Sequence, residues 1–327
     1  MPLPDRRAPV DPIELIERAR AGDLRSRAKL FSLVEDGGSD AEQVIEILSP
    51  HAGRALVVGL TGPPGAGKST LVALLARAIR ESGQTVAILA VDPSSPITGG
   101  ALLGDRIRMQ NLHGDRGAYV RSISTRGATG GLARAVGDMV VLADALGYDV
   151  VIVETVGAGQ DEADVAGIAP TVVVVEAPQL GDAVQSIKAG ILEIASIFVV
   201  NKSDLDCADQ AASYLRSMLS LASGRDGWRP PVLKTSAITG SGVDRLLEAI
   251  HRHHRFLETT GRLTAWPIER ARQMLLEGAR TRILTSILAS LDPAEFERLA
   301  LDLAGHRILL QAGIDRLLDK RDGVSPP

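Results

Sequence analysis

The chain has 327 residues, of which 45% are hydrophobic and 23% are charged, and its formal net charge is −4. This composition is typical of a globular protein, and the absence of a long basic stripe argues against nucleic acid as a main partner. One cysteine, Cys207, excludes an intrachain disulfide. With no signal-peptide pattern and no apolar run of membrane-spanning length, we expect a cytoplasmic protein with no membrane partner.

The first fifty residues predict short helices. Asp11 followed by Pro12 is typical of a helix start, and Gly22 indicates a helix end. A third short helix is expected at residues 41–48. We therefore expect an N-terminal helical extension over residues 1–50.

Valine-rich apolar runs separated by helical patterns occupy residues 51–258. The expected strands are residues 55–60, 85–91, 150–153, 171–175, 197–200 and 232–235, and helices are expected at 69–80, 132–145 and 243–256. Continuous apolar strands that alternate with helices indicate a mostly parallel sheet covered on both faces. We expect an α/β domain with this sheet at its centre.

The pattern becomes helical again after the α/β region. A long helix is expected at residues 268–291, a second from 292 and a third at 307–320. Residues 259–327 are therefore expected to form a C-terminal helical extension.

A phosphate-binding loop is expected between the first strand and the helix that follows it. The loop consists of Gly62, Pro63, Pro64, Gly65, Ala66, Gly67, Lys68 and Ser69. It matches the pattern G-x-x-x-x-G-K-[ST], in which glycines allow backbone N–H groups to surround phosphate oxygens. Lys68 supplies charge toward the β- and γ-phosphates, and Ser69, beside Thr70, offers a hydroxyl to Mg²⁺. These features predict a P-loop nucleotide site.

A second motif, N-K-x-D, indicates which base is bound. It consists of Asn201, Lys202 and Asp204 at the end of an expected strand. A carboxylate at Asp204 can accept hydrogen bonds from the N1–H and the amine of guanine, a pair of donors that adenine lacks. Such a site can reject the wrong ligand by about 10⁴-fold. Ser236 and Ala237 end the next strand, where the backbone can reach the guanine O6, so we expect GTP and GDP as ligands.

Three carboxylates are candidates for the metal side of the site. Asp92 and Glu154 lie at strand ends, and Asp105 follows a glycine-rich segment. Because Mg²⁺ keeps several waters and takes few protein ligands, not all three carboxylates need to contact it. Ser69 is expected as a direct ligand, and the carboxylates bind directly or through water. Helix capping is the alternative role of Asp92 and Asp105.

The segment that begins at Glu154 occupies the place of the D-x-x-G element of GTPases. Its Gly157 can donate an N–H to the γ-phosphate, so Lys68, Glu154 and Gly157 are the expected catalytic residues. Ala158 follows where Ras-like GTPases have a glutamine, and Gln160 is two residues out of register. A GTPase without this glutamine is expected to be slow and to depend on a partner.

Four segments closely resemble the MeaB/ArgK GTPases, the methylmalonyl-CoA mutase-associated G proteins. They are VDPSSPITGGALLGDRIRM at 91–109, RGATGGLAR at 126–134, ETVGAGQDE at 154–162 and GILEIA at 190–195. The resemblance implies a SIMIBI-class P-loop NTPase with helical extensions at both ends, and a homodimer. It implies GTP hydrolysis with Mg²⁺ in support of an adenosylcobalamin-dependent acyl-CoA mutase, with a cobalamin adenosyltransferase as a further partner.

The resemblance also implies roles for individual residues. Asp92, Asp105 and Glu154 would form the metal-side cluster, and Gln160 and Asp161 would lie on a switch that responds to the mutase. Asp161 stands where family members often have serine, a departure that bears on partner identity more than on nucleotide binding.

One alternative is a nickel-insertion GTPase, which needs a Cys/His metal site. Cys207 is the single cysteine, and on the expected helix His251 and His254 share a face while His253 points elsewhere. We therefore expect these histidines at a solvated helix end. A P-loop substrate kinase is a second alternative, which N-K-x-D argues against. A binding module without activity is a third, which the complete phosphate motif argues against.

Overall fold

The protein was analysed as a computed structural model, which describes residues 11–92, 114–124, 131–155, 161–178, 189–221, 227–290 and 292–318. The chain forms two compact units, the first ending at Leu263 and the second beginning at Thr264. The nucleotide-binding motifs all belong to the first unit.

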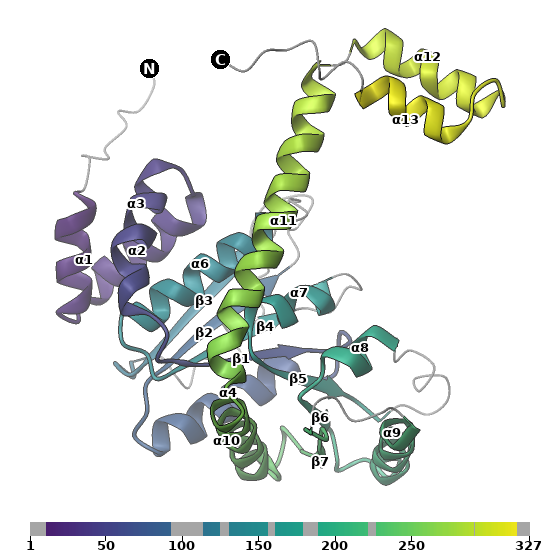
Figure 1. The fold of residues 1–327 in the computed structure, drawn as a ribbon. Coiled ribbons are helices and arrows are strands. Elements are labelled where there is room, and N and C mark those ends of the chain that lie inside the picture. The colour runs from purple at the N-terminus through teal and green to yellow at the C-terminus, as the bar shows by residue number, and fades with distance from the viewer. Residues whose placement is uncertain are drawn as a thin grey trace, which may run out of the picture. The chain divides into compact units, whose positions relative to one another are not determined.

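A parallel seven-stranded sheet forms the centre of the first unit (Figure 1). Its strands are β1 (Leu56–Thr61), β2 (Val86–Asp92), β3 (Ala118–Ser124), β4 (Val150–Thr155), β5 (Thr171–Glu176), β6 (Ile197–Val200) and β7 (Val232–Lys234). The order is β3-β2-β4-β1-β5-β6-β7, and every pair is parallel. The α/β class and the parallel sheet expected from the sequence are confirmed.

The strand β3 was not expected. It pairs with β2 alone and forms one edge of the sheet. Its sequence, AYVRSIS, carries Arg121 and two serines, because an edge strand does not need the continuous apolar run of a central one. The apolar signal that predicted the other six strands is therefore weak here.

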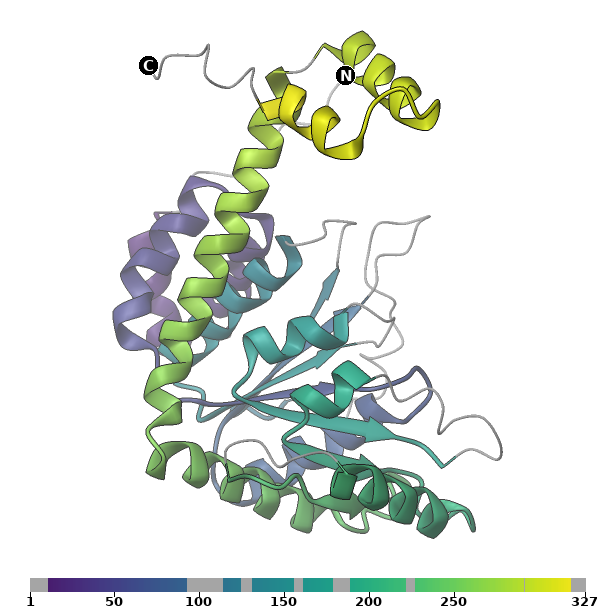
Figure 2. The same ribbon diagram turned by 45° about the vertical axis from the view of Figure 1, so that its right-hand side comes forward.

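Helices cover both faces of the sheet (Figure 2). In the first unit they are α1 (Pro12–Arg20), α2 (Leu24–Asp36), α3 (Ser39–Leu48), the 3-10 turn η1 (Ser49–His51), α4 (Lys68–Glu81), α6 (Gly131–Ala145), α7 (Asp161–Ile168), α8 (Ala189–Ile194), α9 (Ala208–Leu221) and α10 (Val243–Thr259). Alternate strand residues point to opposite faces. One face packs against α4 and α10, and the other packs against α6 at one end and α7, α8 and α9 at the other.

The N-terminal helices belong to the same compact unit as the sheet. The side chain of Asp11 caps α1 by accepting a hydrogen bond from the Ile13 amide at 2.9 Å. Phe31 of α2 stacks on Tyr119 of β3 with ring centroids 4.5 Å apart. Arg121 of β3 forms an ion pair with Glu35 of α2. These helices therefore cover α6 and the edge of the sheet near β3.

The second unit is helical. After α11 (Arg262–Ser290), which passes through Pro267, come α12 (Pro293–Ala304) and α13 (Leu310–Leu318). The expected start of α11 at residue 268 was six residues late. Many apolar side chains here are exposed, including Leu275 at 73% and Leu309 at 79%. No helix in the described ranges has an apolar stretch of the length that a bilayer requires.

One residue of the histidine cluster is buried in the core. His253 of α10 is 5% exposed, and its Nδ1 lies 2.9 Å from the Thr171 hydroxyl at the start of β5. Trp228 and Phe256 pack on its ring. The expectation of a solvated helix end is therefore wrong for His253, because contacts from residues distant in sequence bury it.

This environment makes stability sensitive to acid. Burial, followed by the charges of His254 and Arg262, lowers the pKa of His253 from 6.5 to about 4. An unfolded chain binds this proton at a higher pH than the folded one, so stability is lost as pH falls from about 6.5 toward 4. Each pH unit in this window costs about 1 kcal/mol.

We expect His253→Asn to reduce this loss, since asparagine keeps a hydrogen-bonding atom near the position of Nδ1 and does not titrate. Urea unfolding of both proteins at pH 7, 6 and 5 measures the difference. His51→Gln, a change at an exposed histidine of η1 that is not among the charges acting on His253, is the matched control and should keep the slope of the wild type. Equal pH slopes for wild type and His253→Asn would contradict the assignment.

Candidate functional site

The site lies at the carboxyl end of β1. In the sheet, β1 lies between β4 and β5. The connection that leaves β1 runs to β2, on the β4 side, and the chain later returns to form β5 on the opposite side of β1. In open α/β sheets, ligands bind outside the strand ends where successive connections diverge in this way. The P-loop follows β1 directly at this point.

Close backbone contacts set the shape of the P-loop. Gly62 has φ +139°, and a Cβ atom there would lie 2.0 Å from the carbonyl oxygen of Val175 in β5. Gly67 has φ +87° as the N-terminal cap of α4, and a Cβ atom there would lie 2.5 Å from Nδ2 of Asn201. Only glycine fits at these two positions. The loop is therefore packed between β5 and the N-K-x-D segment.

Lys68 is the first residue of α4 and is 5% exposed. Its Nζ donates hydrogen bonds to the carbonyl oxygens of Gly62 at 2.7 Å and Pro63 at 3.1 Å. The ammonium group is thus held across the loop at the positive end of the α4 dipole. A helix N-terminus with a fixed cation forms a site for phosphate.

The side-chain amide of Asn201 joins three loops. Asn201 is fully buried, and its Nδ2 donates to the carbonyl oxygen of Ala66 in the P-loop at 2.8 Å. Its Oδ1 accepts hydrogen bonds from the Thr235 hydroxyl at 3.1 Å and the Ala237 amide at 3.2 Å. Both ends of the amide are therefore engaged within the protein. The geometry indicates that Asn201 positions the two halves of the site.

The Asp204 carboxylate is exposed at the end of the same segment. Its Oδ1 accepts a hydrogen bond from the Ser236 hydroxyl at 2.6 Å. This bond, a backbone hydrogen bond and the nearby charge of Lys202 lower the pKa of Asp204. The carboxylate is therefore ionised at neutral pH. The bond from Ser236 also fixes its orientation, which a carboxylate needs if it is to accept two hydrogen bonds from one base.

Lys202 lies in the left-handed region with φ +56°. Its carbonyl oxygen accepts the Leu205 amide at 3.0 Å, and the Ser203 amide donates to the carbonyl oxygen of Thr235 at 2.9 Å. These bonds shape the tight turn that carries Asp204. The backbone amide of Ala237, which the sequence suggested for the guanine O6, donates to Asn201 in this structure.

Two of the metal-side residues meet in the structure. The Ser69 hydroxyl donates to Oε1 of Glu154 at 2.7 Å, and both side chains are buried. Glu154 stands in the sheet between Leu60 of β1 and Ala90 of β2. Asp92 ends β2 two residues beyond Ala90, and its side chain lies outside the described residues. Asp105 and Gly157 also lie outside them.

Arg106, Arg108, Arg121 and Arg126 are the arginines of the sequence that could stabilise charge on the phosphates. Arg121 is bound to the N-terminal helices through Glu35 and through the Ser32 hydroxyl at 3.2 Å, which assigns it a structural role. The other three arginines lie outside the described ranges, as does Gln160. Within the described ranges, no group of three or more His, Cys, Asp and Glu residues could hold a metal ion.

The bridging role of Asn201 was missed from the sequence. Ala66 and Asn201 are 135 positions apart, and no local pattern pairs them. The N-K-x-D motif located the residue, and the fold shows its three partners.

Comparison with known proteins agrees with this geometry. Residues 27–292 match the family model of the methylmalonyl-CoA mutase-associated GTPase MeaB. A Pyrococcus abyssi protein named provisionally as a GTPase is 48% identical over 288 residues, which cover 87% of each chain. The mitochondrial methylmalonic aciduria type A homolog of Mus musculus is 40% identical over 212 residues, 64% of this chain and 51% of that protein.

A solved structure described as an LAO/AO transport system kinase superposes with a TM-score of 0.80 at 26% identity, covering 97% of this chain and 99% of that one. It confirms the P-loop NTPase fold with its helical extensions. The family match confirms that the bound nucleotide is a guanine nucleotide and that the activity is GTP hydrolysis. With its P-loop, its base-selecting segment and the match over most of its length, the chain belongs to the MeaB family of methylmalonyl-CoA mutase-associated GTPases.

Proposed function

We propose that this GTPase is a cytoplasmic switch that helps an adenosylcobalamin-dependent acyl-CoA mutase, of the methylmalonyl-CoA type, to load and keep its cofactor. The observation that carries the proposal is the family match over residues 27–292. The name of the Mus musculus relative, which refers to methylmalonic aciduria, supports the same partner. A cobalamin adenosyltransferase is a further partner in this scheme.

In this proposal the P-loop and the N-K-x-D segment act as one rigid receptor. Lys68 and the backbone amides around Gly65 bind the phosphates, and Asp204 accepts the paired donors of guanine. Lys202 covers one face of the base with its aliphatic stem. Because Asn201 bonds to Ala66 and to the loop after β7, the phosphate and base subsites keep a fixed separation. Preorganisation of this kind lowers the entropy cost of binding.

The Ser69 and Glu154 side chains fit a bound Mg²⁺. A hydroxyl and a carboxylate, 2.7 Å apart and buried, are oxygen ligands of the type that Mg²⁺ accepts, and a cation offsets the cost of burying a carboxylate. Asp92 and Asp105 would contribute through water or directly. When bound, Mg²⁺ neutralises charge on the β- and γ-phosphates.

Hydrolysis in this chain requires a positioned water and a contact to the γ-phosphate. Gly157 supplies the contact in our proposal, and Ala158 cannot orient a water as a glutamine does. Since Arg121 is bound to Glu35, it is not available as a charge stabiliser. We therefore propose that the mutase completes the site.

Addition of the cognate acyl-CoA mutase should raise GTP turnover several-fold or more, because it supplies or orders the group that the free chain lacks. Phosphate release from GTP is measured with the chain alone, with mutase alone and with both. Lys68→Ala with mutase is the control for contaminating phosphatase and should remain at background. An unchanged rate with every acyl-CoA mutase of the source organism would reject the partnership.

Asp204→Asn should weaken GTP binding by about 10-fold to 100-fold and allow XTP to bind. Asparagine can still accept the Ser236 hydrogen bond. Its NH₂ group would face the amine of guanine, which is also a donor, but it would donate a hydrogen bond to the 2-oxo group of xanthine. Calorimetric titration with GTP, XTP and ATP measures the change.

Asp206→Asn, an exposed change in the same loop, is the matched control and should bind GTP as the wild type does. Retained preference for GTP over XTP in Asp204→Asn would rule out this carboxylate as the base selector.

We also propose that a second copy of the chain covers apolar side chains of the second unit. Leu275 and Leu276 of α11 are 73% and 71% exposed, and Leu310 of α13 is 62% exposed. No residue of α12 is buried. Large apolar side chains exposed to this extent are typical of interaction sites.

Sedimentation velocity should give twice the mass of one chain for the wild type. The double change Leu275→Asp and Leu276→Asp should shift the equilibrium toward monomer, since it places charge in the apolar surface. Arg280→Gln, an exposed polar change on the same helix, should leave the dimer unchanged. A wild-type monomer at micromolar concentration would refute the proposal.

A further inference from the structure

A second polar cavity lies at the opposite end of the sheet from the P-loop. It has a volume of about 560 Å³ and contains Leu56, the first residue of β1. Along β1, a rise of about 3.3 Å per residue puts the P-loop roughly 17 Å away. The cavity is lined by the end of α1, the η1 turn, the segment that joins α6 to β4, and α10. A volume of this size is typical of small-molecule sites.

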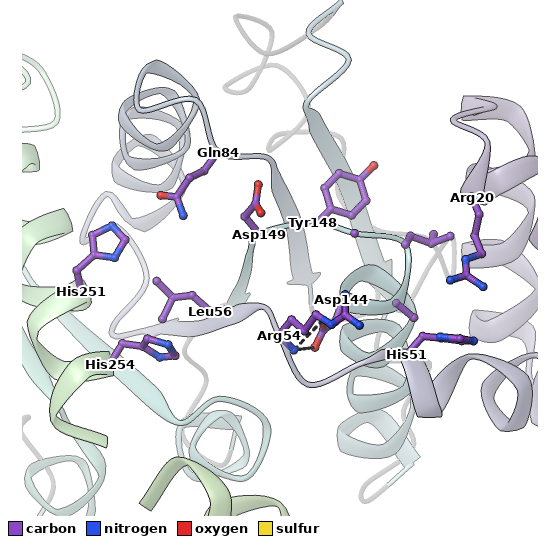
Figure 3. Close-up of a pocket in the computed structure, with 13 residues that line it drawn as sticks. Arg20, His51, Arg54, Leu56, Gln84, Asp144, Tyr148, Asp149, His251 and His254 are labelled. Atoms are coloured by element: carbon purple, nitrogen blue, oxygen red, sulfur yellow. Dashed lines mark hydrogen bonds between the residues drawn. The ribbon is translucent and has the colours of Figure 1, made fainter. Parts of the chain in front are cut away.

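Basic side chains line this cavity from four parts of the fold (Figure 3). Arg20 comes from the end of α1 and Arg54 from the segment before β1, and both are exposed. His51 of η1 and the histidines His251 and His254 of α10 line its sides. Neither arginine makes an ion pair within the part of the chain that the structure describes.

Asp144, one of two carboxylates in the lining, is directed at the backbone. It accepts hydrogen bonds from the amides of Gly53 at 2.6 Å, Arg54 at 3.2 Å and Ala55 at 3.1 Å. These bonds occupy both oxygens and fix the segment that carries the Arg54 side chain. Amide dipoles that converge on a carboxylate offset its charge.

Asp149, the second carboxylate, is engaged through one oxygen. Its Oδ2 accepts hydrogen bonds from the amide of Thr85 at 2.7 Å and from the Thr85 hydroxyl at 2.8 Å. Both oxygens of Asp144 and one of Asp149 therefore bind the chain itself, and His254 lies 3.4 Å from the Glu258 carboxylate. The two guanidinium groups and the imidazoles of His51 and His251 are the lining groups that can meet a ligand.

The surroundings of His251 indicate the sign of such a ligand. Burial, followed by the positive charges of Arg255 and His254, lowers the pKa of His251. Burial itself disfavours a charge of either sign, and only the contribution of Arg255 and His254 indicates a positive local field, which is the sign that Arg20 and Arg54 also give to the cavity.

We propose that this cavity binds a small polyanion, whose phosphate or carboxylate groups contact Arg20 and Arg54. Guanidinium groups bind both kinds of oxyanion with paired hydrogen bonds. The imidazole of His51 supplies a further donor beside the arginines, and that of His251 supplies one across the cavity (Figure 3). The bound anion would contact both the N-terminal helices and α10. This ligand is additional to the nucleotide at the P-loop.

Calorimetric titration of the full chain tests the site, with inorganic pyrophosphate in one arm and citrate in the other. Saturating GDP and Mg²⁺ are present throughout, so that the P-loop is filled. We expect saturable binding of one equivalent of at least one probe, and the arm that responds distinguishes phosphate from carboxylate recognition. Arg20→Gln combined with Arg54→Gln should weaken that binding at least tenfold.

The matched control combines Arg25→Gln with Arg245→Gln, two exposed arginines of α2 and α10 outside the cavity. It removes the same charge and should bind within twofold of the wild type. Equal thermal unfolding of the variants confirms that they fold, and Arg54→Gln alone serves if the double variant does not. Binding of neither probe, or an equal loss in the control pair, would overturn the proposal.

Discussion

A single buried amide holds the nucleotide site together. Asn201 donates to the P-loop at Ala66 and accepts from Thr235 and Ala237, so three segments from different strand ends share one side chain. The bonds to Ala66 and Thr235 are buried and the bond from Ala237 is partly buried. Removal of the amide would leave buried backbone and hydroxyl groups unsatisfied at a cost of about 1–3 kcal/mol each. The spacing between the P-loop and the loop after β7 depends on these bonds.

Much of the fold could be predicted because its signals are local. The central strands are continuous Val/Ile runs since both faces of the sheet are covered, and aspartates mark helix starts such as that of α1 at Asp11. The edge strand β3 escaped prediction because one neighbour and a partly open face allow Arg121 and serines. The burial of His253 escaped because Thr171 and Trp228, which contact it, are far away in sequence.

The candidate site divides in the same way. Its residue types and loops follow from short motifs, and the structure brings together Ser69 and Glu154, which were both expected on the metal side. The hydrogen bond from Ser236 to Asp204 was not predicted. The roles of Asp92, Asp105 and Gly157 stay predictions. The cavity at the amino ends of the strands had no sequence signal, since its basic side chains come from helices and turns that meet only in the folded chain.

The packing of the P-loop against β5 also restricts how this gene can vary. At residue 62 the smallest possible side chain would place its first carbon 2.0 Å from a main-chain oxygen of Val175, and a main-chain oxygen in a central strand cannot move aside. Every substitution at this position therefore produces a steric clash, whatever the chemistry of the new side chain. Position 62 is therefore fixed as glycine by the backbone of a neighbouring strand, independently of any contact that the loop makes with a ligand.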